Sequence, residues 1–117
     1  MKNPEHILQK NAINFFRTKY PKYSINLFAI PNGGKRSAAS GRWLKDEGMT
    51  AGVSDLFLAL PVGNFHGMFI EMKIHPNKPT PSQIEFQQAM QKRGYHAVVC
   101  YDIDKFIIEI EEYLNHR

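Results

Sequence analysis

The spacing of hydrophobic and polar positions divides this chain of 117 residues into segments of two kinds. Where apolar residues recur every three or four positions, the segment is typical of an amphipathic helix. Two stretches have this spacing, and a third is predicted from its ends, because Asn, Thr, Pro and Gly residues are typical of helix termini. The predicted helices are 4–20, 81–93 and 103–114, with a shorter one over 42–47.

The other apolar stretches are shorter and rich in β-branched and aromatic residues, which favours strands. The predicted strands are 23–30, 53–60, 66–74 and 95–101. The second and third are joined by a short loop with Gly63 and Asn64, which predicts an antiparallel hairpin. The fourth is strongly apolar, and we expect it at the centre of the sheet.

Helices and strands thus alternate in the order α-β-α-β-β-α-β-α, which predicts a mixed α/β domain of two or three layers. The sequence contains no internal repeat, no low-complexity tract and no linker long enough to separate domains. We therefore expect one domain over residues 1–117.

The composition agrees with a globular protein, because 43% of the residues are hydrophobic and 22% are charged. No apolar run approaches the roughly 18 residues of a membrane-spanning helix, and the first residues do not resemble a signal peptide. The one cysteine, Cys100, has no partner for an internal disulfide. These features predict a protein of the cytoplasm without a membrane association.

Positive charge is concentrated in the first hundred residues. The net charge is +4, but residues 101–117 carry −3, so the preceding residues carry +7. Such a balance favours a polyanionic partner such as nucleic acid. Two glycines would permit close approach of a phosphate backbone, and nearby cations would neutralise it; the alternative is a solvated turn. The candidate contacts are Gly33, Gly34, Lys35, Arg36, Arg42 and Lys45.

Alternation along the predicted hairpin places acidic residues on one face, because residues two apart in a strand share a face. Glu71 and Lys73 share one face of the second hairpin strand, and Asp55 lies on the polar side of the first. The residues expected on the opposite, apolar side are Leu56, Leu58, Leu60, Met68, Ile70 and Met72. A hairpin centred on Gly63 then sets Asp55 opposite Glu71.

Opposed residues in a hairpin have Cβ atoms about 4.5–5.5 Å apart, where two carboxylates repel each other. A cation between Asp55 and Glu71 would relieve this repulsion. Mg²⁺ binds one or two carboxylates together with water and phosphate oxygens, and it activates water for attack on phosphorus. Lys73 could then hold a phosphate oxygen or the attacking water. The alternative is a surface carboxylate pair neutralised by Lys73.

The same residues carry a resemblance to a known family. The segments GVSDL (52–56), FIEMK (69–73), SQ (82–83) and GY (94–95), with PNGGKR (31–36) before them, resemble the VRR-NUC domain of the PD-(D/E)XK nuclease superfamily, especially its small, often phage-encoded members. Ser54 stands where the motif usually has proline, a residue that shapes the backbone and binds no metal. The resemblance implies a restriction-endonuclease-like core, αβββαβ plus a C-terminal helix.

The resemblance also implies Mg²⁺- or Mn²⁺-dependent hydrolysis of DNA. Asp55, Glu71 and the backbone carbonyl of Met72 would be metal ligands, and Lys73 the catalytic lysine. Glu5, in the first predicted helix, would add a further acidic ligand; its alternative role is to stabilise the positive helix N-terminus. Gln83 would lie near the metal, and its alternative role is a capping box.

Compact relatives of this kind resemble Holliday-junction resolvases, so branched DNA is the substrate that we consider first. Each chain offers one site, and cutting two strands would need a homodimer. A second hypothesis is a non-catalytic nucleic-acid-binding module that keeps the nuclease fold. A third is an enzyme acting on another phosphate-containing substrate.

Overall fold

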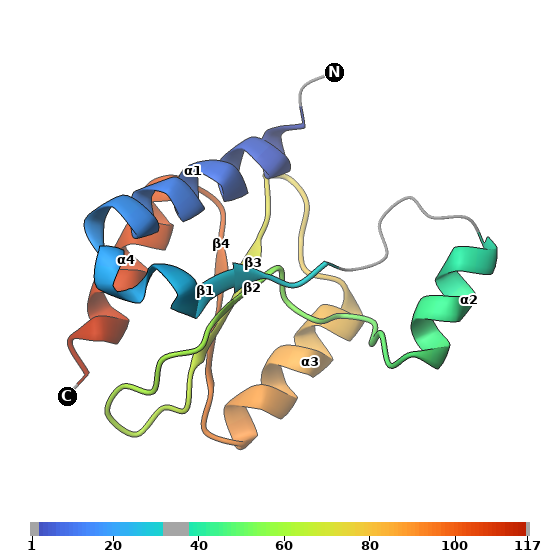
Figure 1. The fold of residues 1–117 in the computed structure, drawn as a ribbon. Helices are drawn as coiled ribbons and strands as arrows, with labels where there is room; N and C mark the ends of the chain where they lie inside the picture. Colours follow the sequence, from blue (N-terminus) through green and yellow to red (C-terminus); the bar gives the residue numbers. More distant parts are fainter. Residues whose placement is uncertain (1–2, 32–37, 117) are drawn as a thin grey trace.

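A computed structural model describes residues 3–31 and 38–116, with residues 38–40 as backbone only. Its elements follow one another in the order expected for the resembled family, with additional short helices (Figure 1). They are α1 (Pro4–Lys19), the 3-10 helix η1 (Pro21–Asn26), β1 (Leu27–Ala29), α2 (Ala38–Asp46), β2 (Leu56–Leu58), β3 (Met68–Met72), α3 (Pro81–Lys92), β4 (His96–Cys100) and α4 (Ile103–Leu114).

The strands form one mixed sheet in the order β1-β2-β3-β4. Strand β2 is antiparallel to both β1 and β3, and β4 runs parallel to β3. Helices α1 and α4 cover one face of this sheet and α3 covers the other, which makes three layers (Figure 1). The predicted fold class, a mixed sheet flanked by helices, is confirmed.

The core lies between the sheet and the α1–α4 layer. The alternation predicted for the hairpin is confirmed, because the side chains expected on its apolar side are buried there, apart from the half-buried Leu60. The core residues are Leu8, Ala12, Phe16, Leu27, Leu56, Leu58, Met68, Ile70, Met72, Cys100, Phe106, Ile110 and Tyr113. Burial of this apolar surface is the main force that holds α1 and α4 to the sheet.

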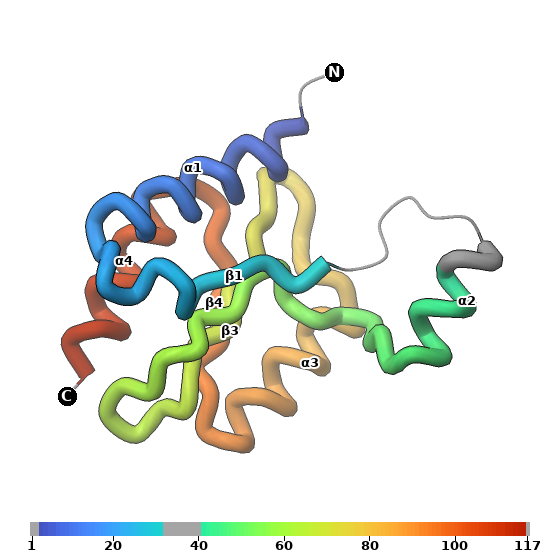
Figure 2. Tube along the Cα trace, in the orientation of Figure 1, coloured from blue at the N-terminus to red at the C-terminus, as the bar shows by residue number. Residues whose placement is uncertain are grey.

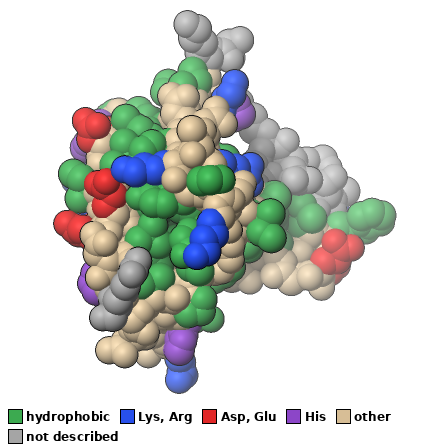
Figure 3. Space-filling view, turned by 60° about the vertical axis from the view of Figure 1, so that its left-hand side comes forward, with side chains coloured by type: hydrophobic (Ala, Val, Ile, Leu, Met, Phe, Trp, Pro, Cys, Tyr) green, Lys and Arg blue, Asp and Glu red, His purple; other side chains and the backbone are tan. Residues whose placement is uncertain are grey.

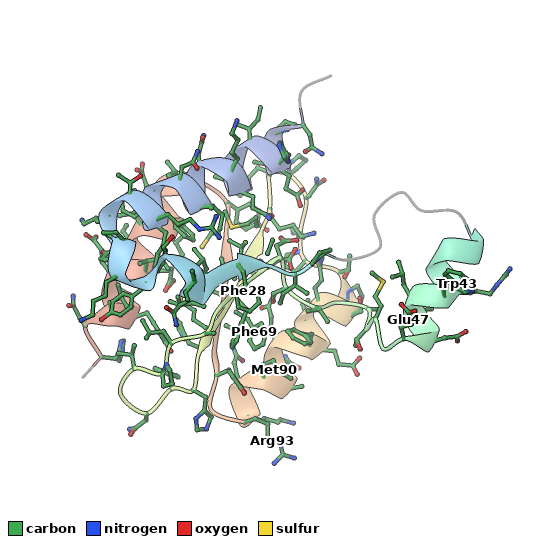
Figure 4. All side chains as sticks on the ribbon, in the orientation of Figure 1. Phe28, Trp43, Glu47, Phe69, Met90 and Arg93 are labelled. Atoms are coloured by element: carbon green, nitrogen blue, oxygen red, sulfur yellow. The ribbon has the colours of Figure 1, made fainter. Side chains whose placement is uncertain are left out.

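The opposite face of the sheet is aromatic. The Phe57 and Phe69 rings lie 4.5 Å apart between their centroids, and Phe69 meets Phe86 of α3 edge to face at 5.1 Å. Figure 4 shows Phe28, Phe69 and Met90 on this side of the sheet. Helix α3 covers this face over the β4 side of the sheet, whereas Phe28 at the β1 side stays exposed.

Side-chain caps begin the long helices at the predicted residues. The Asn3 side chain accepts hydrogen bonds from the backbone N–H groups of Glu5 and His6, each at 3.1 Å. Thr80 and Gln83 form a reciprocal capping box at the start of α3. Such caps satisfy N–H groups that have no partner inside the helix, and they stabilise it by about 1 kcal/mol each.

The strand predicted over 23–30 is wrong in its first half. Residues up to Asn26 form η1, and Ile25 is 89% exposed. Side chains occupy the backbone groups that a longer strand would pair: the Arg17 guanidinium donates to the carbonyls of Ser24 and Leu27, and the Asn26 amide donates to the carbonyl of Ala59. Regular pairing with β2 starts at Leu27, and one further backbone bond precedes it, because the N–H of Ala59 donates to the Asn26 carbonyl at 2.7 Å.

Three further predictions need correction. Strand β4 is the last strand of the sheet and not a central one among the described residues; it is apolar because α3 and α4 contact it from the two faces. The short helix begins at Ala38, four residues earlier than predicted. The hairpin strands are also shorter than predicted, since pairing covers only Leu56–Leu58 and Met68–Met72.

Helix α2 stands apart from the three layers, and the tube in Figure 2 shows it projecting from the edge of the sheet where β1 ends. Trp43, on this helix, is 76% exposed and lies away from the sheet (Figure 4). Among the described helices, none is long and apolar enough to cross a membrane.

Candidate active site

Three acidic side chains converge at the edge of the sheet where β2 starts and β3 ends. Glu5 comes from the first turn of α1, Asp55 from the residue before β2, and Glu71 from β3. Each offers one carboxylate oxygen, and these three oxygens lie within 4.8 Å of one another. The structure thus brings together the acidic residues that the sequence analysis selected.

The hairpin register positions two of these carboxylates. Leu56 pairs with Ile70, as predicted, so the preceding residue Asp55 lies beside Glu71. The Asp55 carboxylate does not project freely, because its Oδ2 accepts a 2.7 Å hydrogen bond from the backbone N–H of Met72. The Asp55 carbonyl also accepts a hydrogen bond from Ile30, which ties it to the end of β1. Backbone contacts on both sides therefore hold Asp55 in place.

A glycine brings the segment before β2 against α3. Gly52 has a φ of +86°, and a Cβ at this position would collide with the backbone carbonyl of Ser82. This positive φ and the absence of a side chain both require glycine. The close approach lets Asp55 and the first turn of α3 meet around Glu71.

Glu71 is the most deeply buried of the three acidic residues, with 1% of its surface exposed. Its Oε2 accepts a 3.2 Å hydrogen bond from the Gln83 amide and lies 3.9 Å from the Lys73 ammonium. Its Oε1 is buried without a hydrogen-bond partner among the described residues. A buried polar atom without a partner is costly, so this oxygen is suited to a ligand.

Burial and charge also change the protonation of this carboxyl. Desolvation is the main cause that raises the pKa of Glu71 from 4.5 to about 8, and Asp55 raises it further, whereas Lys73 lowers it. Without a further cation, Glu71 therefore keeps its proton at neutral pH. A divalent cation would favour the ionised form and relieve the repulsion among the carboxylates.

Lys73 lies next to this cluster, on the same side of β3 as Glu71. Both side chains are buried, so they do not form the solvated surface pair that was the alternative to a metal site. A buried ammonium needs anionic partners to offset its lost hydration. Glu71 supplies one, and a phosphate oxygen would supply another.

The structure confirms the capping box of Gln83 and also brings its side chain to Glu71. Its side-chain Oε1 accepts a 2.8 Å hydrogen bond from the N–H of Thr80, which caps α3. The other end of the same amide, Nε2, donates to Glu71. The cap thus orients the amide toward the carboxylate. The Met72 side chain belongs to the core, so only its backbone could contact the site.

The predicted nucleic-acid contacts are partly described. Gly33, Gly34, Lys35 and Arg36 lie outside the described residues. Arg42 and Lys45 are exposed on α2, apart from the carboxylates. On the face drawn in Figure 3, several Lys and Arg side chains lie near the middle and one lies at the lower tip, whereas most Asp and Glu side chains lie toward the two sides.

Two polar groups near the site had no role in the sequence analysis. The Ser54 hydroxyl, beside Asp55, and the Gln87 amide nitrogen, one turn after Gln83, are buried without a hydrogen-bond partner among the described residues. The spacing of Gln83 and Gln87 was visible in the sequence, because residues four apart share a helix face. The burial of Ser54 was not, since it depends on the packing of its loop.

Comparisons with known proteins agree with this geometry. The family model described as "VRR-NUC domain" matches residues 8–102. A solved structure titled "VRR_NUC domain protein" is 27% identical in sequence and superposes with a TM-score of 0.83, over 97% of this chain and 90% of that one. No curated protein matches the chain significantly. The family match begins after Glu5, so the position of Glu5 rests on the structure.

Proposed function

This chain belongs to the VRR-NUC family, whose domain has a nuclease-type fold, and from that premise we propose that it is a metal-dependent endonuclease acting on DNA. The observation that carries the proposal is the convergence of three carboxylates around a buried Glu71 oxygen that has no hydrogen-bond partner in the described part of the chain. A family match alone does not distinguish an active enzyme from a binding module. The carboxylate cluster destabilises the fold unless a cation is bound, and a module that only binds DNA has no need of it, so the cluster favours the active enzyme.

The donor set suits a hard divalent cation, because every ligand offered is oxygen. Asp55, Glu71 and the carbonyl of Met72 would hold Mg²⁺ or Mn²⁺, with Glu5 as the further acidic ligand. The bound ion would lower the pKa of a water molecule and neutralise charge on the phosphoryl group.

The chain's own residues would position the reactants. Lys73, 3.9 Å from Glu71, would hold a phosphate oxygen through its ammonium group. Gln83 would keep the Glu71 carboxylate oriented through its amide hydrogen bond. The water oxygen would attack phosphorus in line with the leaving 3′ oxygen, so the P–O3′ bond breaks and a 5′ phosphate remains.

The substrate and the assembly complete the proposal. Branched DNA, such as a four-way junction, is the substrate that we propose, with contacts from the Gly33–Arg36 segment and from Arg42 and Lys45. One site per chain cuts one strand, so cleavage of two strands would use a homodimer, the commonest symmetric assembly.

The experiment is an incubation of the chain with supercoiled, linear, single-stranded and four-way-junction DNA, with and without Mg²⁺ or Mn²⁺. We expect metal-dependent cleavage that Asp55→Ala and Lys73→Ala abolish. Glu85→Ala and Lys92→Ala, exposed acidic and basic positions on α3, are matched controls that should cleave normally. Binding of DNA without any cleavage would support the non-catalytic module, and normal cleavage by both site variants would refute the assignment.

A further inference from the structure

A stacked pair of rings lies where β3 and β4 end. His75 and Tyr101 have centroids 4.1 Å apart and planes inclined by only 15°. His75 is exposed and Tyr101 is half-buried. Among the described residues, neither ring takes part in another ring contact or in a side-chain hydrogen bond. The pair therefore does not belong to the aromatic face that packs against α3.

The backbone places this pair beside the carboxylates. Because β3 and β4 are parallel, their carboxyl ends meet at the same edge of the sheet, below the start of α1 (Figure 1). The Lys73 N–H donates a 3.0 Å hydrogen bond to the carbonyl of Cys100, so the backbone segments at the ends of β3 and β4 are still side by side at the site. Tyr101 follows Cys100 directly, and His75 lies two residues after Lys73.

The pair has a counterpart at the other end of the same strands. His66 and Tyr95, which precede β3 and β4, have ring centroids 5.6 Å apart. Tyr95 also contacts Phe57 and Phe69, so this second pair extends the packed aromatic face. Only the pair at the site's end presents rings that this packing does not use. The two pairs thus provide a test position and a control position in one molecule.

We propose that His75 and Tyr101 form a stacking platform for an unpaired nucleobase next to the phosphate that is cleaved, an inference that rests on the proposed nuclease function. Exposed aromatic rings stack on bases without sequence preference, because every base has a flat π face. Within a duplex that face is covered by the neighbouring base pairs. A platform at the site therefore selects DNA with unpaired nucleotides, as at a branch point or in a single strand.

Two other groups, Asp102 and Trp43, bear on the choice of this pair. Asp102, next to Tyr101, accepts a hydrogen bond from the N–H of Lys105 and so serves as the cap of α4. Trp43 offers a larger exposed ring, but it lies on α2, away from this edge and from the carboxylates (Figure 4).

The test compares two fluorescent oligonucleotides of equal length, oligo(dT) and an abasic analogue that keeps every phosphate. Fluorescence anisotropy with EDTA measures the affinity of the whole chain for each without cleavage. We expect the unaltered chain to prefer oligo(dT) by about tenfold or more, the effect of stacking one base. His75→Ala and Tyr101→Ala should bring the ratio toward one, Tyr101→Phe should preserve it, and His66→Ala should leave it unchanged.

The outcomes separate this inference from the nuclease proposal. An unchanged ratio in His75→Ala, whose exposed ring can be removed without disturbing the core, would overturn the platform, as would an equal loss in His66→Ala. An unaltered chain without base preference would overturn it too. Metal-dependent cleavage is measured in parallel, so a base preference that depends on His75 in a chain that cuts nothing would support the platform and refute hydrolysis.

Discussion

Replacing Glu71 by glutamine should stabilise the metal-free chain at alkaline pH while abolishing its proposed activity. Glutamine has nearly the same shape as glutamate but carries no charge. Burial and the neighbouring carboxylates raise the pKa of Glu71 from 4.5 to about 8. Below pH 4.5 the carboxyl is protonated in the folded and the unfolded chain, so the two variants should then differ little in stability.

The magnitude follows from linkage between proton binding and folding. Between pH 4.5 and 8 the folded chain keeps the Glu71 proton that the unfolded chain has released, so the free energy of unfolding falls as the pH rises. Each pKa unit corresponds to about 1.4 kcal/mol, which gives a total loss of about 5 kcal/mol above pH 8. This is an upper value, because water entry and relaxation reduce the desolvation penalty. Glu71→Gln does not lose this stability, because its side chain does not ionise.

Urea unfolding followed by circular dichroism, in EDTA at pH 5 and at pH 8.5, measures this effect. The advantage of Glu71→Gln should grow by several kcal/mol between the two pH values, and Glu85→Gln, an exposed control on α3, should show no such change. Added Mg²⁺ at pH 8.5 should stabilise the unaltered chain and not Glu71→Gln. An advantage that is the same at both pH values would refute the reasoning.

Three further predictions test the surroundings of the site. Gln83→Leu removes the hydrogen bond to Glu71 and should weaken Mg²⁺ binding about 10- to 100-fold in calorimetry. Gln87→Leu removes an amide nitrogen that has no partner among the residues the structure describes, and it should not weaken binding. Leu58→Ala should lower the free energy of unfolding by about 2–5 kcal/mol, and Ile25→Ala, at an exposed position, by less than about 0.5 kcal/mol, as urea titrations would show. Burial raises the pKa of Cys100 to about 12, so a thiol reagent at pH 8 should label it only when denaturant unfolds the chain.

The sequence predicted the site best where backbone periodicity alone decides the geometry. The alternation of the hairpin strands and the loop around Gly63 were enough to place Asp55 beside Glu71, because a strand has a strict period of two. The pairing of Leu56 with Ile70 confirms that register. Caps were equally predictable, since Thr80 and Gln83 need only their spacing in the chain.

The sequence failed where distant side chains compete with the backbone. Residues 23–26 have the composition of a strand, but Arg17 and Asn26 bind the carbonyls around them, and no local pattern reveals that competition. The position of β4 at the end of the sheet was missed for a similar reason. An apolar run indicates that both faces of a strand are packed against other elements. It does not indicate whether the strand has a neighbouring strand on each of its two edges.

The three carboxylates differ in what holds them, and this difference connects the site to folding. Asp55 and Glu71 are held together by the hairpin, whereas Glu5 reaches them only when α1 packs on the sheet through the core. An ion that binds all three therefore binds the folded chain far better than the unfolded one, and its binding energy adds to the stability of α1. The same cluster that weakens the metal-free fold would then fasten the first helix to the sheet once the ion is bound.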